Sequence, residues 1–214
     1  FRSAPTSASA RFAKACYLRR VGGPTERAES EQLLRQLAQE RPNDPRVLNA
    51  LGKAIGDNGR RLDRADEALA VLARAAAMPA GRAEALSETG WILYILNRFT
   101  EAEAAIDASL ADQTSRSALL GKVNLTIERG APEDAQAALA KMPPETIRSD
   151  AGVALATRVW LFSRQPEKVL EILSGVTRDY LSSNTGGGSP VDLTRGEAYQ
   201  LQGKTQAAEN AWSA

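Results

Sequence analysis

The hydrophobic positions between residues 85 and 110 recur at intervals of three and four, which is the spacing along one face of a helix. The pattern runs in two stretches separated by the polar pair Asn97-Arg98, and its members are Ala85, Thr89, Ile92, Leu93 and Leu96, then Phe99, Ala102, Ile106 and Leu110. Thr100 precedes Glu103 by three residues, an arrangement typical of the first turn of a helix. The segment therefore predicts two short amphipathic helices, and the short connection makes them pack antiparallel.

The same helix-pair pattern recurs along nearly the whole chain. Positions equivalent to Gly90 follow one another at intervals of 34, 38, 33, 34 and 39 residues, and they are Leu18, Gly52, Gly90, Val123, Thr157 and Gly196. The two longest intervals contain insertions, at residues 58–61 and 185–189. A period near 34 residues that is built from helix pairs indicates a repeat protein.

These repeats resemble the tetratricopeptide repeat family. The clearest copies are Leu51-Gly52, Ile55, Ala68, Leu72 and Ala75, then Gly90, Phe99, Ala102 and Ile106, and finally Gly196, Tyr199, Gly203 and Ala208. Val123 and Thr157 replace the usual glycine, so the resemblance depends on the repetition and not on one copy. It implies an all-α, right-handed superhelical solenoid of antiparallel helix pairs, with about five pairs and a partial one.

The periodicity also predicts how the chain is divided. We expect a loose lead-in over residues 1–10 and a helical repeat domain over 11–214. The glycine-rich segment 178–189 is expected to be a mobile loop between repeats. The approximate repeats are 11–44, 45–82, 83–115, 116–148, 149–178 and 189–214.

Composition and charge exclude several classes of protein. The 214 residues are 43% hydrophobic and 25% charged, which is ordinary for a globular protein, and no run is long enough to span a bilayer. The net charge of +1 and the lack of aromatic side chains among the arginines argue against nucleic-acid binding. Residues 1–25 carry five basic and no acidic side chains, which can indicate a transit peptide; we favour a first helix, because residues 9–21 have a helical pattern.

The sequence offers little for catalysis. It has no histidine and one cysteine, Cys16, which exclude His-based triads and the usual zinc sites. Residues 198–205 approach a phosphate-binding loop, but Ala198 replaces its first glycine and a helix precedes it. A glycosylation sequon at Asn124 falls inside a predicted helix, so we expect it to be unmodified. We therefore predict no catalytic residues, no metal, no cofactor and no enzymatic activity.

The resemblance instead implies a concave groove that is lined by the first helix of each pair and binds a peptide or helix of a partner protein. The family's register places eight residues on that face: Asn49, Lys53, Ser87, Trp91, Tyr94, Asn124, Glu128 and Arg158. Trp91 and Tyr94 are the kind of side chain that anchors an interface, although packing between repeats would also explain them. Lys53, Asn124 and Arg158 could meet a carboxylate, or could be solvated polar groups. The family's Lys/Asn carboxylate clamp is not transferred, because Asn49 and Lys53 occur in swapped order.

The sequence thus predicts a scaffold or adaptor for protein–protein interaction, for example in secretion, pilus or envelope assembly. Two alternatives stay open: a regulatory module of a larger signalling protein, such as a kinase or transcription regulator, and self-association through an uncapped last helix. The chain resembles an excised piece, since it starts without methionine and stops inside a predicted helix. We expect a cytoplasmic location in a bacterium, with a periplasmic or membrane-tethered one open.

Overall fold

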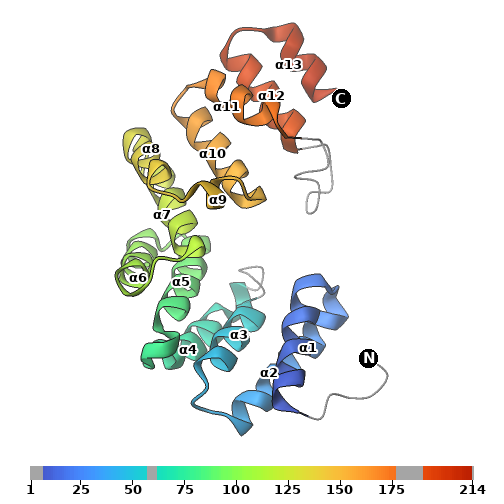
Figure 1. Ribbon diagram of the computed structural model, residues 1–214, viewed down its shortest axis with the longest axis vertical. Coiled ribbons are helices and arrows are strands. Elements are labelled where there is room, and N and C mark those ends of the chain that lie inside the picture. Colours follow the sequence, from blue (N-terminus) through green and yellow to red (C-terminus); the bar gives the residue numbers. More distant parts are fainter. Residues whose placement is uncertain (1–6, 57–61, 177–189, 214) are drawn as a thin grey trace. The chain divides into compact units, whose positions relative to one another are not determined.

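The computed structural model describes residues 7–56, 62–176 and 190–213, and the regular structure in these ranges is helical (Figure 1). The chain divides into two compact units, residues 1–121 and 122–214, and the border between them falls within one helix, α7. The predicted loop 178–189 and most of the predicted lead-in lie outside the described residues. The prediction of a single repeat domain over 11–214 stays a prediction.

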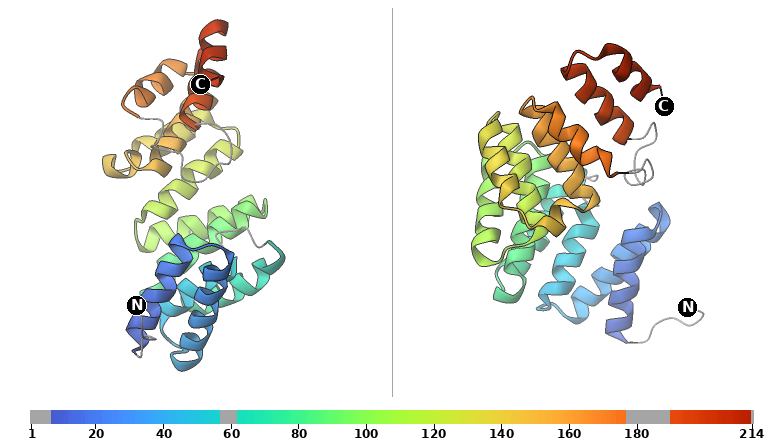
Figure 2. Two further views of the ribbon diagram at one scale, coloured as in Figure 1. Left: turned by 90° about the vertical axis from the view of Figure 1, so that its right-hand side faces the viewer. Right: turned by 45° about the horizontal axis from the view of Figure 1, so that its top comes forward.

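Unit 1 consists of antiparallel helix pairs, which Figure 2 shows from two further directions. The first pair begins at Ala8, inside the range 1–10 that the sequence assigned to a lead-in. A 3-10 turn, Leu62–Arg64, precedes the second helix of the next pair. The helices are α1 (Ala8–Val21), α2 (Pro24–Glu40), α3 (Pro45–Gly56), α4 (Ala65–Ala76), α5 (Pro79–Ile95) and α6 (Phe99–Asp112), followed by the start of α7 (Arg116–Glu128).

Unit 2 continues with the same kind of element. Its helices after α7 are α8 (Pro132–Ala140), α9 (Pro144–Ile147), α10 (Asp150–Phe162), α11 (Pro166–Ser174), α12 (Pro190–Leu201) and α13 (Thr205–Trp212). The sequence did not predict α9, because Pro143-Pro144 indicates the end of a helix. Proline is also favourable at the first position of a helix, and Pro144 begins one turn there. The last pair, expected to be partial, contains both α12 and α13.

Four turns between the paired helices share one backbone conformation. Asn97, Gly130, Arg164 and Gly203 have positive φ angles of 59°, 73°, 53° and 73°. The N–H group after each of them donates to a carbonyl in the last turn of the preceding helix, for example from Arg98 to Leu93 at 2.9 Å. This is the Schellman motif, which ends a helix in a defined direction. The motif recurs at the predicted period and matches the register assigned to Gly90, Val123, Thr157 and Gly196.

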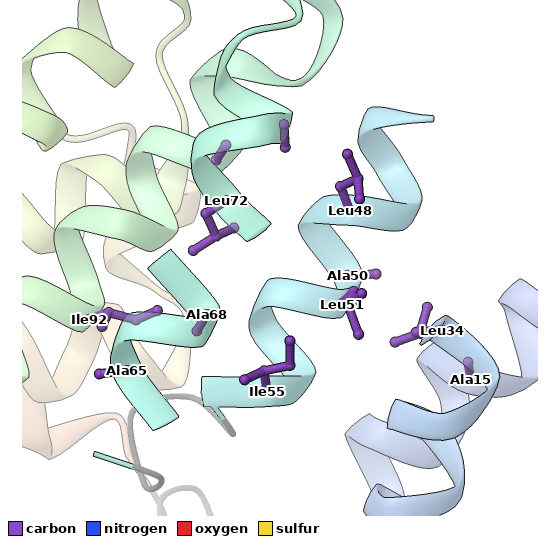
Figure 3. Packing of buried hydrophobic residues seen from close by; sticks show 12 residues of the cluster. Ala15, Leu34, Leu48, Ala50, Leu51, Ile55, Ala65, Ala68, Leu72 and Ile92 are labelled. Atoms are coloured by element: carbon purple, nitrogen blue, oxygen red, sulfur yellow. The ribbon is translucent and has the colours of Figure 1, made fainter. Parts of the chain in front are cut away.

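The core of unit 1 forms where the helix pairs meet, and Figure 3 shows Leu34, Leu51 and Leu72 from three successive helices within it. Small residues allow this close approach. A Cβ atom on Gly52 would lie 2.6 Å from Cγ of Leu72. A Cβ atom on Gly121 would lie 2.5 Å from Cδ1 of Ile106, which also fills the space beside Gly90. In unit 2 the core contains Val153, Val169, Leu173, Val191 and Ala198.

Candidate functional site

A pocket of about 250 Å³ lies between the first helices of successive pairs in unit 1. Two of the eight predicted groove residues, Lys53 and Trp91, line it. We call it the α3–α5 pocket, and its lining is Gly52, Lys53 and Gly56 from α3, Glu88, Trp91, Ile92 and Ile95 from α5, and Ser117 from α7. The pocket therefore brings together an aromatic ring, two isoleucines and a charged pair.

Two glycines that lie one helical turn apart on α3 line the pocket. Gly52 and Gly56 carry no side chain, so the backbone of α3 forms part of the wall. A Cβ atom on Gly56 would touch Cδ1 of Ile92 at 3.4 Å, a contact at the edge of ordinary van der Waals distance. A side chain at Gly56 would reduce the space between α3 and α5, whereas one at Gly52 would meet Leu72 of α4.

Trp91 is held by a hydrogen bond and by ring contacts. Its indole N–H donates to Oγ of Ser117 at 2.9 Å and lies 3.2 Å from the carbonyl oxygen of the same residue. The ring of Tyr94 meets it edge-on, with ring centroids 5.8 Å apart and planes at 80°. Tyr94 in turn contacts Phe99, also at 5.8 Å, and does not line the pocket. Tyr94 thus contacts the ring of Trp91 without lining the pocket.

Lys53 lies between two carboxylates of α5. Its ammonium nitrogen is 3.0 Å from Oε1 of Glu84 and 3.0 Å from Oε1 of Glu88. Burial alone would lower the pKa of Lys53, but the two carboxylates outweigh it and the pKa is raised. The side chain of Glu88 is 17% exposed, whereas that of Glu84 is 54% exposed. Lys53, which the sequence predicted could meet a ligand carboxylate, is therefore already paired with two carboxylates of the protein.

Two predicted groove residues are buried and do not line the pocket. Asn49 is 1% exposed and Ser87 is 2% exposed. The amide nitrogen of Asn49 donates to the carbonyl oxygen of Gly81 at 3.1 Å and to Oε2 of Glu84 at 3.3 Å. Asn49 thus joins α3 to the first turns of α5. The expectation that these two side chains face a ligand is corrected by their burial.

The remaining three predicted residues meet in unit 2. Nη1 of Arg158 donates to Oδ1 of Asn124 at 2.7 Å, and Nη2 donates to Oε1 of Glu128 at 2.6 Å. The bonds join α7 to α10, and their partners are 34 and 30 residues apart in sequence, close to one repeat. Arg158 is thus engaged by its own neighbours, and the placement of these residues on a concave face stays a prediction. A ligand carboxylate would have to compete with Glu128.

Sequence reasoning missed Glu88, Ile95 and Ser117. A signal for Glu88 was present, because it lies three residues before Trp91 on the same predicted helix and Glu84 lies four residues before it. Ile95 lies four residues after Trp91, so the same helical spacing would have placed it on the face of Trp91. Nothing in the sequence indicates Ser117, because its contact with Trp91 depends on how α7 packs beside α5.

The site lacks the groups of a metal or thiol centre. In residues 7–56, 62–176 and 190–213 no cluster of three or more His, Cys, Asp or Glu side chains could hold a metal ion. Burial raises the pKa of the Cys16 thiol, and Cys16 is not part of the pocket lining. No helix in the described part of the chain is long and apolar enough to cross a membrane.

Two solved structures share this fold over most of their length. The chain superposes on PilW, described as a widely conserved type IV pilus biogenesis factor, with a TM-score of 0.73 and 17% identity, covering 97% of this chain and 91% of PilW. It superposes on PilF of Pseudomonas aeruginosa with a TM-score of 0.67 and 15% identity, covering 95% and 88%. No protein-family model and no curated protein matches the sequence. The fold is thus all-α and of the tetratricopeptide-repeat type, as the sequence predicted.

Proposed function

We propose that this protein is an interaction scaffold that binds a segment of a partner protein in the α3–α5 pocket. The observation that carries the proposal is the ring of Trp91, which lines a pocket while Ser117 fixes its indole N–H. A tryptophan that is already held in place loses little further freedom when a partner binds. Tryptophan in a partly enclosed pocket is also the side chain that most often dominates the energy of an interface.

The size of the pocket supports a side chain as its occupant. Pockets for whole small molecules usually measure roughly 300–1,000 Å³ and bury most of the ligand. The α3–α5 pocket measures about 250 Å³ and is lined by few polar groups. It suits one or two side chains of a protein segment whose remainder lies outside the pocket.

Among the roles open to such a scaffold, we favour an adaptor in the assembly of a multi-protein apparatus. The support is the likeness of fold to PilW and PilF, the first of which is described as a pilus biogenesis factor. A regulatory module of a signalling protein and a self-association module have no comparable observation in their favour. The cytoplasmic location expected from the sequence stays a prediction.

The test is selection of displayed random peptides against three immobilised proteins: the wild type, Trp91→Ala and Trp160→Ala. Trp160 is the matched control, because it is also a half-buried tryptophan but lies in unit 2, over the ammonium group of Lys168. The variants are first compared with the wild type by far-UV circular dichroism and thermal unfolding. We expect wild type and Trp160→Ala to enrich common peptides, and folded Trp91→Ala to lose them. Peptides retained by Trp91→Ala, or no enrichment by the wild type, would overturn the proposal.

A further inference from the structure

We infer that the α3–α5 pocket selects a partner segment that carries an aliphatic side chain beside a lysine or arginine. The inference rests on the proposed function and names the chemistry of the partner. It has two parts, an apolar wall within the pocket and an excess of negative charge at and beside its lining, which come from different residues. Both parts lie within unit 1.

The apolar wall is formed by Trp91, Ile92 and Ile95 on α5, opposite the glycines of α3. An aliphatic side chain such as leucine, isoleucine or methionine would cover this wall and release the water that contacts it. Gly56, where a Cβ atom would touch Ile92, leaves room beside the wall for such a side chain. The wall therefore favours a partner segment with an aliphatic side chain at this position.

Two charged side chains line the pocket, Lys53 and Glu88, and a third, Glu84, lies beside the lining and pairs with Lys53. Lys53 is shared by Glu84 and Glu88, so the three groups carry a net formal charge of −1. Glu84 is the more exposed of the two carboxylates and so remains accessible to a second cation. A lysine or arginine of the partner that pairs with Glu84 would bring the cluster to neutrality, which is the electrostatic complementarity expected of an interface.

A partner carboxylate meets the opposite situation. It would approach Lys53 only by displacing Glu84 or Glu88, each of which lies 3.0 Å from the ammonium nitrogen. The displaced glutamate would then lie beside a second carboxylate, and like charges at short range disfavour the complex. Glu84 and Glu88 thus repel acidic segments. A lysine without these two partners would instead attract them.

The first experiment compares the amino acids enriched beside the aliphatic anchor in the selected peptides. The wild type is tested together with the triple variant Lys53→Glu/Glu84→Lys/Glu88→Lys. This variant retains opposite charges between α3 and α5 but reverses the net charge of the cluster from −1 to +1. We expect lysine and arginine to be enriched by the wild type, and aspartate and glutamate by the triple variant. Acidic residues enriched by the wild type, or no change in the charge preference of the folded triple variant, would overturn the inference.

The second experiment does not depend on the folding of the triple variant. It measures the affinity of one selected peptide, and of the same peptide with its basic residue changed to glutamine, for wild type, Glu84→Gln, Glu88→Gln and Glu209→Gln. For a partly exposed ion pair we expect the loss of Glu84 or of the peptide's charge to weaken binding up to about fivefold. Glu209→Gln, at an exposed carboxylate in unit 2, is expected to bind as the wild type does. Equal affinity of both peptides for all four proteins would overturn the inference.

The two experiments distinguish a failure of the proposed function from a failure of the inference about charge. Peptides that are lost with Trp91→Ala but show no preference for basic residues would leave the proposed function standing and remove the inference about charge. Peptides that bind regardless of Trp91 would remove both.

Discussion

The indole N–H of Trp91 donates a hydrogen bond to Oγ of Ser117 at 2.9 Å. The bond joins α5 to the first turn of α7 and determines which face of the indole ring is turned toward the α3–α5 pocket. The carbonyl oxygen of Ser117 is a second acceptor at 3.2 Å. The orientation of Trp91 is therefore set by the backbone as well as by the serine hydroxyl, so that the loss of the hydroxyl alone leaves one acceptor.

This geometry predicts a graded effect of substitutions on peptide affinity. Trp91→Ala removes the aromatic wall and should weaken a selected peptide by about thirtyfold or more, as expected of an interface hot spot. Trp91→Phe retains a ring but loses the N–H group, so its effect should be smaller. Ser117→Ala should change affinity by about twofold at most, because the carbonyl oxygen still accepts. Fluorescence anisotropy of a labelled peptide measures all three, and equal losses would contradict this arrangement.

Gly90 is predicted to be essential for the packing of α5 on α6. A side chain there would meet Ile106 and would lie 3.1 Å from the carbonyl oxygen of Ala102. Gly90→Ala should therefore lower the free energy of unfolding by about 1–3 kcal/mol, despite the better helix propensity of alanine. Gly175 is the control, because no atom within 4 Å would meet a new Cβ and its φ is −95°. Denaturation by urea compares the two, and equal stability of both variants would contradict the packing argument.

The positive φ angle at Arg164 predicts a stabilising substitution. Arginine is strained at φ 53°, whereas glycine adopts this conformation without cost, so Arg164→Gly should raise the free energy of unfolding by about 0.5–1 kcal/mol. The reverse change at the equivalent turn, Gly130→Ala at φ 73°, should lower it by about 1 kcal/mol. Both variants lie in unit 2 and are measured by the same thermal unfolding. Opposite signs from those expected would show that the turns do not share one conformation.

An ion-pair network between α2 and the 3-10 turn that precedes α4 predicts a dependence of stability on pH. Glu31 accepts hydrogen bonds from Arg64 at 2.8 and 2.9 Å and from Arg35 at 2.8 Å. The bonds from Arg64 lower the pKa of Glu31 and outweigh the opposing effect of its partial burial. The unfolded carboxyl group takes up its proton at higher pH than the folded one. The stabilisation is therefore complete above the ordinary value of 4.5 and is lost as the pH falls through the lowered pKa.

Glu31→Gln should consequently lower the free energy of unfolding at pH 7 by about 1 kcal/mol. The difference from wild type should shrink as the pH falls below 4.5, where the wild-type carboxyl begins to be protonated in the unfolded chain. Urea denaturation at a series of pH values measures both, and Glu209→Gln, an exposed carboxylate of α13, is the control. A difference that stays constant between pH 7 and pH 3 would refute the role given to Glu31.

The sequence predicted the fold well because a repeat displays the same physical requirement several times. Asn97, Gly130 and Gly203 are residues that tolerate positive φ, and each indicated its turn. Arg164 gave no such signal, because arginine rarely adopts this conformation. Its turn was indicated by Pro166, which begins the next helix. The short helix α9 was missed because consecutive prolines indicate the end of a helix more often than its beginning.

The site was predicted less completely because the register locates a face and not the neighbours of each side chain. Lys53 and Trp91 line a pocket, whereas Asn49 and Ser87, predicted for the same face, are buried. Burial of Asn49 depends on a carbonyl oxygen that becomes accessible only when α5 packs against α3. The pairing of Lys53 with Glu84 spans 31 residues, so it could have been sought at a distance of about one repeat.

The fluorescence of Trp91 tests the central claim most directly. In the variant Trp160→Phe/Trp212→Phe it is the one tryptophan left of the three in the sequence. Addition of a selected peptide should shift its emission to shorter wavelength, with a saturation curve that gives the same Kd as anisotropy of the labelled peptide. Saturable binding by anisotropy without any change in the emission of Trp91 would contradict the account and place the partner outside the α3–α5 pocket.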